Sequence, residues 1–343
     1  AAASDLFGWS VSVHGDTAIV GAPFANLPGA ADAGAAYVFV RSGGVWAQEA
    51  KLTAWGAAPG DQFGVSVSIS GNSVLVGARF DDVTRGVDAG SAYVFARSGG
   101  VWSPQVKLEA SDGTTSDLFG FSVAIHQDIA IVGTPNHDHA GGAEAGAAYV
   151  FVRGGSGIWS QQAKLTASDA AAGDGFGSTV AVHNQTAVVG AQGDTHAGGD
   201  SAGSAYVFVR SVSWSQQAKL IASDAGANDW FGYSVAIQGN LAVVGSIFDD
   251  HAGGIDAGSA YVFDRSSGFW TEAGKLTAPG AAANDGMGTI VAISGDTVLA
   301  GVYRDDHAGG ANAGSVQTFA LGRDCDGDTV PDECALVADA DLD

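Results

Sequence analysis

Residues 229–275 decide the fold. They read D-W-F-G-Y-S-V-A-I-Q-G-N-L-A-V-V-G at Asp229–Gly245, F-D-D-H-A-G-G-I-D-A-G-S-A-Y-V-F-D-R at Phe248–Arg265, and W-T-E-A-G-K at Trp270–Lys275. The chain repeats this pattern six times, with 55 to 57 residues between successive Phe-Gly pairs. The pairs begin at Phe7, Phe63, Phe119, Phe176 and Phe231, and Met287-Gly288 replaces the pair in the last copy. A repeat of this regularity indicates an array of similar structural units.

Each repeat predicts four short antiparallel strands. In the fifth copy, alternating or continuous apolar runs separated by Gly-rich and Asp-rich turns predict strands at Phe231–Ile237, Leu241–Gly245, Ser259–Arg265 and Phe269–Leu276. No segment of the chain shows a sustained helical period. Four antiparallel strands in a repeated unit are typical of a β-propeller blade. We therefore predict an all-β fold, a propeller of six four-stranded blades, with an open solenoid of β-units as the alternative.

The pattern F-G-x-S-V-x-I-x-G-x-x-x-V-V-G-A resembles the FG-GAP repeat of integrin α-subunit propellers. With G-S-A-Y-V-F-x-R-S-G-x-W-x-Q-x-A-K-L between the Phe-Gly pairs, it resembles the bacterial FG-GAP variety more closely. The resemblance covers Asp5 to about Leu321 and implies a propeller fold but no reaction. Integrin-type repeats often carry a calcium loop between their first two strands. The corresponding turns here are too short and too poor in carboxylates to supply the six to eight oxygens that calcium takes.

The last repeat stops after its third predicted strand, Ser315–Leu321. Propellers usually complete such a blade, because an open strand edge invites unwanted pairing. A strand upstream of Ala1, a three-stranded blade, or a strand donated by a neighbouring chain would each account for the gap. We expect a propeller domain over residues 1–321, with repeats starting near residues 5, 61, 117, 174, 229 and 285, and an acidic tail over 322–343. A seventh blade would be expected if upstream sequence is missing.

Composition limits the classes of partner. The 343 residues contain 14 Lys and Arg against 37 Asp and Glu, a net charge of -23. This charge opposes binding to nucleic acids and anionic membranes, whose partners use basic patches. No run of 18 apolar residues predicts a membrane span. The chain starts at Ala1 without an initiator methionine, so we expect a processed or trimmed product. We expect it to be secreted or displayed at the surface of a bacterial cell.

The loop between the second and third strands carries the pattern D-D-H-A-G-G-x-D-A-G in several repeats. Carboxylates beside backbone carbonyls suit calcium, and histidines suit transition metals, so these loops are candidate metal or ligand sites. The alternative is turn chemistry, in which Asp and Asn side chains hydrogen-bond to nearby backbone. The candidates are Asp81, Asp82, Asp88, Asp249, Asp250, His251, Asp256, Asp305, Asp306 and His307, with His139 and His196 at related positions.

Two other sets of residues keep the repeat register. The tryptophans of the predicted fourth strands could stack on sugars or, more simply, pack between blades; they are Trp46, Trp102, Trp159, Trp214 and Trp270. We expect the repeated arginines and lysines to pair with carboxylates on neighbouring strands. No arrangement of nucleophile, base and acid stands out, so we predict that the chain is not an enzyme.

The tail contains the sharpest local signal, D-C-D-G-D-T-V-P-D-E-C at Asp324–Cys334. Its alternating carboxylates resemble the thrombospondin type 3 and dockerin calcium loops. That resemblance implies calcium ligands at Asp324, Asp326, Asp328 and Asp332, with Glu333 as a further candidate. Thr329 stands where such loops usually have glycine, and an acidic linker is the alternative. Cys325 and Cys334 suggest a local disulfide in an oxidising compartment, and a reduced pair is the other option.

These observations together predict a non-enzymatic extracellular binding or adhesion module with calcium bound in the tail. The expected partner is a protein or glycan ligand on the face that carries the Asp/His loops. A lectin, and a homopolymeric surface fibre in which each chain donates a strand to the incomplete last blade, are the alternatives. A glycan-cleaving enzyme on the acidic face is a further, less favoured hypothesis, because fold alone does not decide function.

Overall fold

The computed structural model describes residues 2, 4–306 and 310–321. Within these ranges the chain forms strands and turns and no helix, so it contains no helix that is long and apolar enough to cross a membrane. The chain groups into two compact units. One comprises residues up to 184 with 211–214, and the other comprises 185–210 and the chain from 215 onward.

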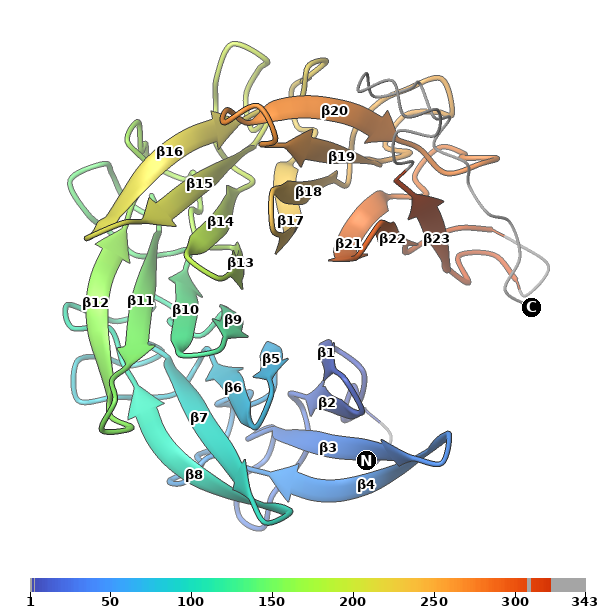
Figure 1. The fold of residues 1–343 in the computed structure, drawn as a ribbon. Helices are drawn as coiled ribbons and strands as arrows, with labels where there is room; N and C mark the ends of the chain where they lie inside the picture. The colour runs from blue at the N-terminus through green and yellow to red at the C-terminus, as the bar shows by residue number, and fades with distance from the viewer. Residues whose placement is uncertain (1, 3, 307–309, 322–343) are drawn as a thin grey trace. The chain divides into compact units, whose positions relative to one another are not determined.

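The first three blades belong to the first unit, and each is a four-stranded antiparallel sheet in chain order. Figure 1 shows each of these blades as a separate sheet. Blade one contains β1 (Val11–His14), β2 (Thr17–Ala22), β3 (Ala35–Ser42) and β4 (Val45–Leu52). Blade two contains β5 (Val67–Ser70), β6 (Ser73–Ala78), β7 (Ser91–Ser98) and β8 (Val101–Leu108). Blade three contains β9 (Ser122–His126), β10 (Ile129–Thr134), β11 (Ala147–Arg153) and β12 (Trp159–Leu165).

The remaining blades repeat the same meander. Blade four contains β13 (Thr179–His183), β14 (Thr186–Ala191), β15 (Ser204–Arg210) and β16 (Trp214–Leu220). Blade five contains β17 (Phe231–Gln238), β18 (Leu241–Ser246), β19 (Ser259–Asp264) and β20 (Thr271–Leu276). The last sheet has three described strands, β21 (Met287–Ser294), β22 (Thr297–Val302) and β23 (Ser315–Ala320). The predicted all-β propeller fold with six blades is confirmed, including the three-stranded last blade.

Strand limits follow the sequence pattern closely. The fifth repeat was predicted to form four strands, and all four are present within one or two residues of the predicted limits. The two-residue turn between β17 and β18 contains Gly239 at φ +61°, a conformation that glycine adopts without steric cost. Periodicity and turn chemistry were therefore sufficient to predict the local structure of the repeat.

The phenylalanine of the Phe-Gly pair fills the core of its own blade in the second to fifth repeats, whereas Phe7 of the first repeat is 47% exposed. Phe63 is fully buried, and its ring makes edge-on contacts with Tyr93 and Phe95 at centroid distances of 5.5 and 6.1 Å. Such aromatic pairs add to the free energy gained from burial. The equivalent residues Phe119, Phe176, Phe231 and Met287 are also fully buried. The aromatic residues of the third strand thus explain why the repeat keeps a large apolar residue at this position.

The glycines of the repeat allow consecutive blades to approach backbone to backbone. A Cβ on Gly77 of β6 would lie 2.0 Å from the carbonyl oxygen of Gly120, in the Phe-Gly pair of the next blade. Gly90, which precedes β7, forms a parallel bridge with Phe119 of that blade. A side chain larger than hydrogen cannot fit at Gly77 without moving backbone. The same approach recurs at Gly21, Gly133 and Gly245.

We predict that Gly77→Ala lowers the free energy of unfolding by about 1–3 kcal/mol, the range for overpacking of a well-packed interior. The expected cause is the clash with the Gly120 carbonyl. Thermal and urea denaturation followed by circular dichroism would measure the loss. Gly155→Ala is the matched control, because a Cβ there meets no atom within 4 Å. Equal stability of the two variants would contradict the proposed role of the close approach.

Candidate functional site

The Asp/His loop of blade five is held together by its own side chains. Asp249, only 1% exposed, accepts hydrogen bonds from the hydroxyl groups of Ser259 and Tyr261 at 2.6 and 2.9 Å. Its Oδ2 also lies 2.7 Å from the Lys275 ammonium. The next loop residue, Asp250, accepts a bond from the backbone N–H of Asp256 at 2.8 Å. Both carboxylates are therefore bound to groups of the chain itself.

The histidine of this loop also bonds to the loop backbone. His251 Nδ1 accepts a hydrogen bond from the N–H of Gly253 at 2.9 Å, and its Nε2 donates to the carbonyl of Gly258 at 3.1 Å. Both ring nitrogens are used, which favours the tautomer protonated at Nε2. His139 and His196 make the same two kinds of bond in blades three and four.

The loops of the other blades follow this scheme with local changes. In blade two, Tyr93 donates to Asp81, Lys107 lies 3.0 Å from the same carboxylate, and Asp82 accepts from the N–H of Asp88. In blade six, Asp306 accepts from the N–H of Asn312, and the carbonyl of Asp305 accepts from the N–H of Gly314. His307 lies outside the described residues.

Lysine, tyrosine and aspartate form one network at this end of the blades. Tyr261 donates to Asp224 of the preceding linker as well as to Asp249, and Lys275 bridges the same two carboxylates at 2.7 Å each. Burial raises the pKa of Asp224, but hydrogen bonds from Lys275 and Tyr261 outweigh burial and lower that pKa overall. The pKa of Tyr261 is raised, first by burial and then by the neighbouring carboxylates. These shifts keep the aspartate charged and the tyrosine protonated at neutral pH.

Blade three replaces the buried aspartate with a histidine. His137 Nδ1 lies 2.8 Å from Asp117, and its Nε2 lies 2.6 Å from the Lys164 ammonium. Lys164 also pairs with Asp112 at 2.7 Å. The predicted pairing with carboxylates is found for Lys164 and also for Arg41–Asp16 and Arg153–Asp128. Arg265 differs, because it bonds to the neutral side chains of Asn240 and Gln217.

Metal binding by these loops stays a prediction. The described part of the chain contains no group of three or more His, Cys, Asp or Glu side chains placed to hold a metal ion. The carboxylates of Asp81, Asp82, Asp249, Asp250 and Asp306 lie against a lysine, a tyrosine or a backbone N–H. Asp88, Asp256 and Asp305 make their contacts through backbone atoms. The tail candidates Asp324, Asp326, Asp328, Asp332 and Glu333, with Cys325 and Cys334, lie outside the described residues.

The repeated tryptophans lie at the contacts between consecutive blades. The indole N–H of Trp102 donates to Glu49 of the preceding blade, that of Trp159 lies 3.5 Å from Gln105, and that of Trp270 donates to Gln217. Arg41, Arg153 and Arg265 lie over the rings of Trp46, Trp159 and Trp270 in cation–π geometry. These contacts favour packing between blades over sugar stacking for this register of tryptophans.

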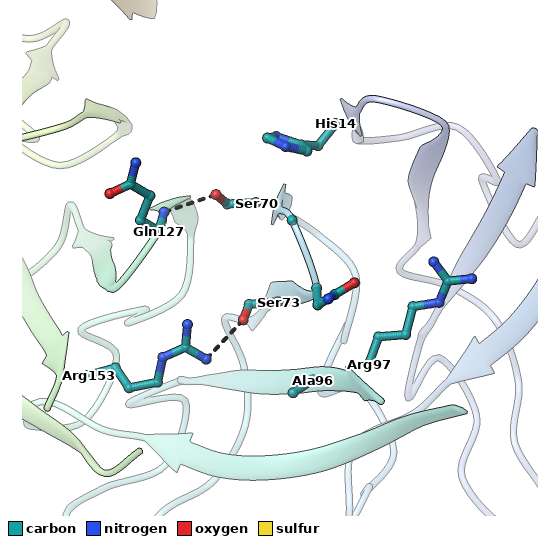
Figure 2. Close-up of a pocket in the computed structure, with 9 residues that line it drawn as sticks. His14, Ser70, Ser73, Ala96, Arg97, Gln127 and Arg153 are labelled. Carbon is teal, nitrogen blue, oxygen red and sulfur yellow. Dashed lines mark hydrogen bonds between the residues drawn. The ribbon is translucent and has the colours of Figure 1, made fainter. Parts of the chain in front are cut away.

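A cavity of about 490 Å³ opens at the other end of the strands, in the first unit. Figure 2 shows the side chains around it, with Ser73 between Arg153 and Arg97. Its walls come from the β5–β6 turn, the ends of β1, β7 and β11, and the β9–β10 turn. The lining consists of His14, Ser70, Gly71, Asn72, Ser73, Ala96, Arg97, Gln127 and Arg153. Sequence reasoning missed this cavity because it treated these short turns as connections only.

Comparison with protein families identifies six copies of the FG-GAP repeat, which match residues 1–39, 46–95, 102–151, 159–208, 214–263 and 270–319. This chain belongs to the FG-GAP repeat family. Comparison with curated proteins finds no match. Among solved structures, the FG-GAP chain is similar to Sqt1 of Saccharomyces cerevisiae, with a TM-score of 0.48 and 10% identity, over 92% of this chain and 82% of that one.

Linker aspartates give the FG-GAP blades a defined pH dependence. Asp61 is 2% exposed and accepts a hydrogen bond from the Ala58 N–H at 2.7 Å. Burial raises its pKa from 3.8 to about 6, and the charges of Asp81 and Asp82 add to this effect. Because its folded pKa lies above its unfolded value, the folded state binds more protons between these two values. Its contribution to stability is therefore present below pH 3.8 and lost as the pH rises through about 6.

We predict that Asp61→Asn stabilises the protein at pH 7 relative to pH 4.5, because the amide keeps the acceptor for Ala58 and carries no buried charge. Thermal midpoints at the two pH values would measure this difference. Asp224→Asn is the control of opposite sign, because the lowered pKa of Asp224 means that its charged form stabilises the fold at pH 7. A stability loss for Asp61→Asn that is larger at pH 7 than at pH 4.5 would contradict the assignment.

Proposed function

We propose that this chain is a non-enzymatic binding or adhesion module that acts outside the cell or at its surface. Membership of the FG-GAP family supports this proposal, since such repeats are typical of extracellular or cell-surface proteins. The observation that carries the non-enzymatic part is the pairing of the loop side chains with the chain's own groups. Asp249, Tyr261 and Lys275 are bound to one another, an arrangement that stabilises loops rather than presenting a free acid or base.

The proposed binding surface is the end of the blades that carries the Asp/His loops. Two of these loops expose an apolar side chain directly before their last aspartate. Val87 in blade two is 59% exposed, and Ile255 in blade five is 67% exposed. Trp55, in the linker after blade one, is 40% exposed and packs edge-on against Tyr93 at 4.6 Å. Exposed apolar side chains held by rigid loops suit a protein ligand, and Trp55 also suits a glycan.

Calcium is proposed as the ion of the tail loop. The support is the alternation of carboxylates at Asp324, Asp326 and Asp328, a spacing that directs side-chain oxygens to one centre. In the D-D-H-A-G-G loops, by contrast, the carboxylates of Asp249, Asp250 and Asp306 already accept hydrogen bonds from the chain. A calcium ion there would have to displace Lys275 from Asp249 or a backbone N–H from Asp250.

Isothermal titration of calcium into the full chain tests this proposal. We expect binding by the native chain and its loss in the double variant Asp326→Asn/Asp328→Asn. The double variant Asp250→Asn/Asp306→Asn removes two loop carboxylates and is the matched control, for which we expect unchanged binding. If the loop variant loses calcium and the tail variant retains it, the repeated loops are the metal sites and the tail assignment is wrong.

A second candidate function is a homopolymeric surface fibre. It is favoured by the last sheet, in which β23 is the outermost of three described strands while the other five sheets have four. A strand donated by another copy would pair with the outer side of β23 and complete the blade. A glycan-cleaving site has no comparable observation among the described residues.

Strand donation predicts an assembly larger than the monomer. Light scattering across a range of concentrations should show growing mass, and Val316→Pro in β23 should reduce it, because proline removes a backbone donor from the strand. The control Thr297→Pro places the same change on β22 and should instead lower the thermal midpoint. A monomer at every concentration would contradict the fibre and leave the binding module.

A further inference from the structure

The cavity between the β5–β6 turn and the ends of β7 and β11 is positively lined in a strongly acidic chain. Arg97, Arg153 and His14 contribute to its walls, and no carboxylate does. The whole chain has only 14 Lys and Arg against 37 Asp and Glu. Ser70, Asn72 and Gln127 supply further polar groups. The volume of about 490 Å³ falls in the range of small-molecule sites in proteins.

Comparison with blades one and three shows that blade two lacks their aspartate at the turn between its first two strands. In each of five blades, the arginine at the end of the third strand donates its backbone N–H to the second residue of the first turn. In blades one and three that residue is an aspartate, and its carboxylate accepts from the arginine Nε, at 2.8 Å for Arg41–Asp16 and 2.7 Å for Arg153–Asp128. In blade two the residue is Asn72, which carries no charge, and the Nε of Arg97 is buried without a hydrogen-bond partner.

Arg97 pairs instead with a carboxylate of the preceding blade. Arg97 Nη2 donates to Glu49 of β4, which also accepts from the Trp102 indole at 2.8 Å. The corresponding acceptors of Trp159 and Trp270 are the neutral Gln105 and Gln217. Glu49 thus draws the guanidinium of Arg97 away from the turn, where the carboxylates of the sister blades lie. The cavity occupies the space that is left.

Arg153, on the opposite wall of the cavity, is fixed in place by hydrogen bonds to two other side chains. Arg153 is fixed by Asp128 through Nε and Nη2, while its Nη1 donates to the hydroxyl of Ser73 at 3.2 Å. Ser73 is 3% exposed and is the first residue of β6. The bond therefore joins Arg153 to the strand that directly follows the Asn72 turn. A guanidinium that other hydrogen bonds already hold in place loses little conformational entropy when it donates a hydrogen bond to a further partner.

We propose that this cavity binds the carboxylate of a small polar molecule, which takes the place of the aspartate that blades one and three have at this turn. The carboxylate would accept charge-assisted hydrogen bonds from Arg97, in competition with Glu49, and lie within the positive field of Arg153. A single negative charge fits better than a polyanion, because the net charge of -23 repels extended anions. The site lies at the end of the blades opposite the Asp/His loops, and it does not depend on calcium.

Titration calorimetry with the full chain tests this inference, with D-glucuronate as the probe and D-glucose as its uncharged counterpart. We expect heat from glucuronate and none from glucose. Asn72→Asp should weaken glucuronate binding about tenfold or more, because the new side chain supplies an internal carboxylate and repels the ligand. This variant has the residue of blades one and three, so its fold should persist, which thermal melting would verify.

The matched control is Asn240→Asp, the same substitution at the equivalent turn of blade five. Asn240 already accepts hydrogen bonds from Arg265 at 3.3 and 3.1 Å, and this turn lies outside the cavity. We expect unchanged glucuronate affinity. Equal binding by the native chain and Asn72→Asp, equal affinity for glucose, or no binding of glucuronate would each overturn the proposal. Inorganic sulfate that binds as tightly as glucuronate would overturn the assignment to a carboxylate.

Discussion

The structure depends on the close contact between a glycine in the second strand of one blade and the Phe-Gly backbone of the next. At Gly77 the space for a side chain is occupied by the Gly120 carbonyl, and Gly120 itself has φ +92°. A side chain at Gly77 would clash with that carbonyl, and the positive φ of Gly120 is a conformation that glycine adopts most readily. Phe119, which precedes Gly120, is buried against Tyr149 and Phe151 of its own blade. One short motif therefore positions each blade on its neighbour and fills its core.

This constraint leaves the ends of the strands to vary. The Asp/His loops and linkers at one end carry lysine, tyrosine and aspartate, whose bonds tie one repeat to the linker before it. The buried charge of Asp249 is tolerated in this network because it has a lysine partner and several hydrogen bonds. At the other end, two-residue turns vary one residue at a time. Asn72 in place of aspartate is one such change, and Glu49, where later blades have glutamine, is a change within strand β4.

The two ends therefore suit different roles. The loops at the Asp/His end are long, present Val87 and Ile255 to solvent, and are rigid because their polar groups are bonded internally. A surface of this kind favours recognition of a large partner. The cavity beside Asn72 is small, polar and positively lined, which favours a small anion. Such changes cost the fold little stability, because a change in one turn of a repeat protein leaves the packing of the other blades unaltered.

The propeller fold and its strands could be predicted from the sequence, because hydrophobic periodicity and glycine-rich turns are local signals that recur six times. It also offered both hypotheses for the Asp/His loops, metal site or turn chemistry. Only the tertiary structure placed Asp249 beside Lys275 and Tyr261, and Arg97 beside Glu49. These contacts join residues 12 to 48 positions apart or lie across blades, so no local pattern encodes them. The Arg97–Glu49 contact in particular depends on where the neighbouring blade presents its carboxylate.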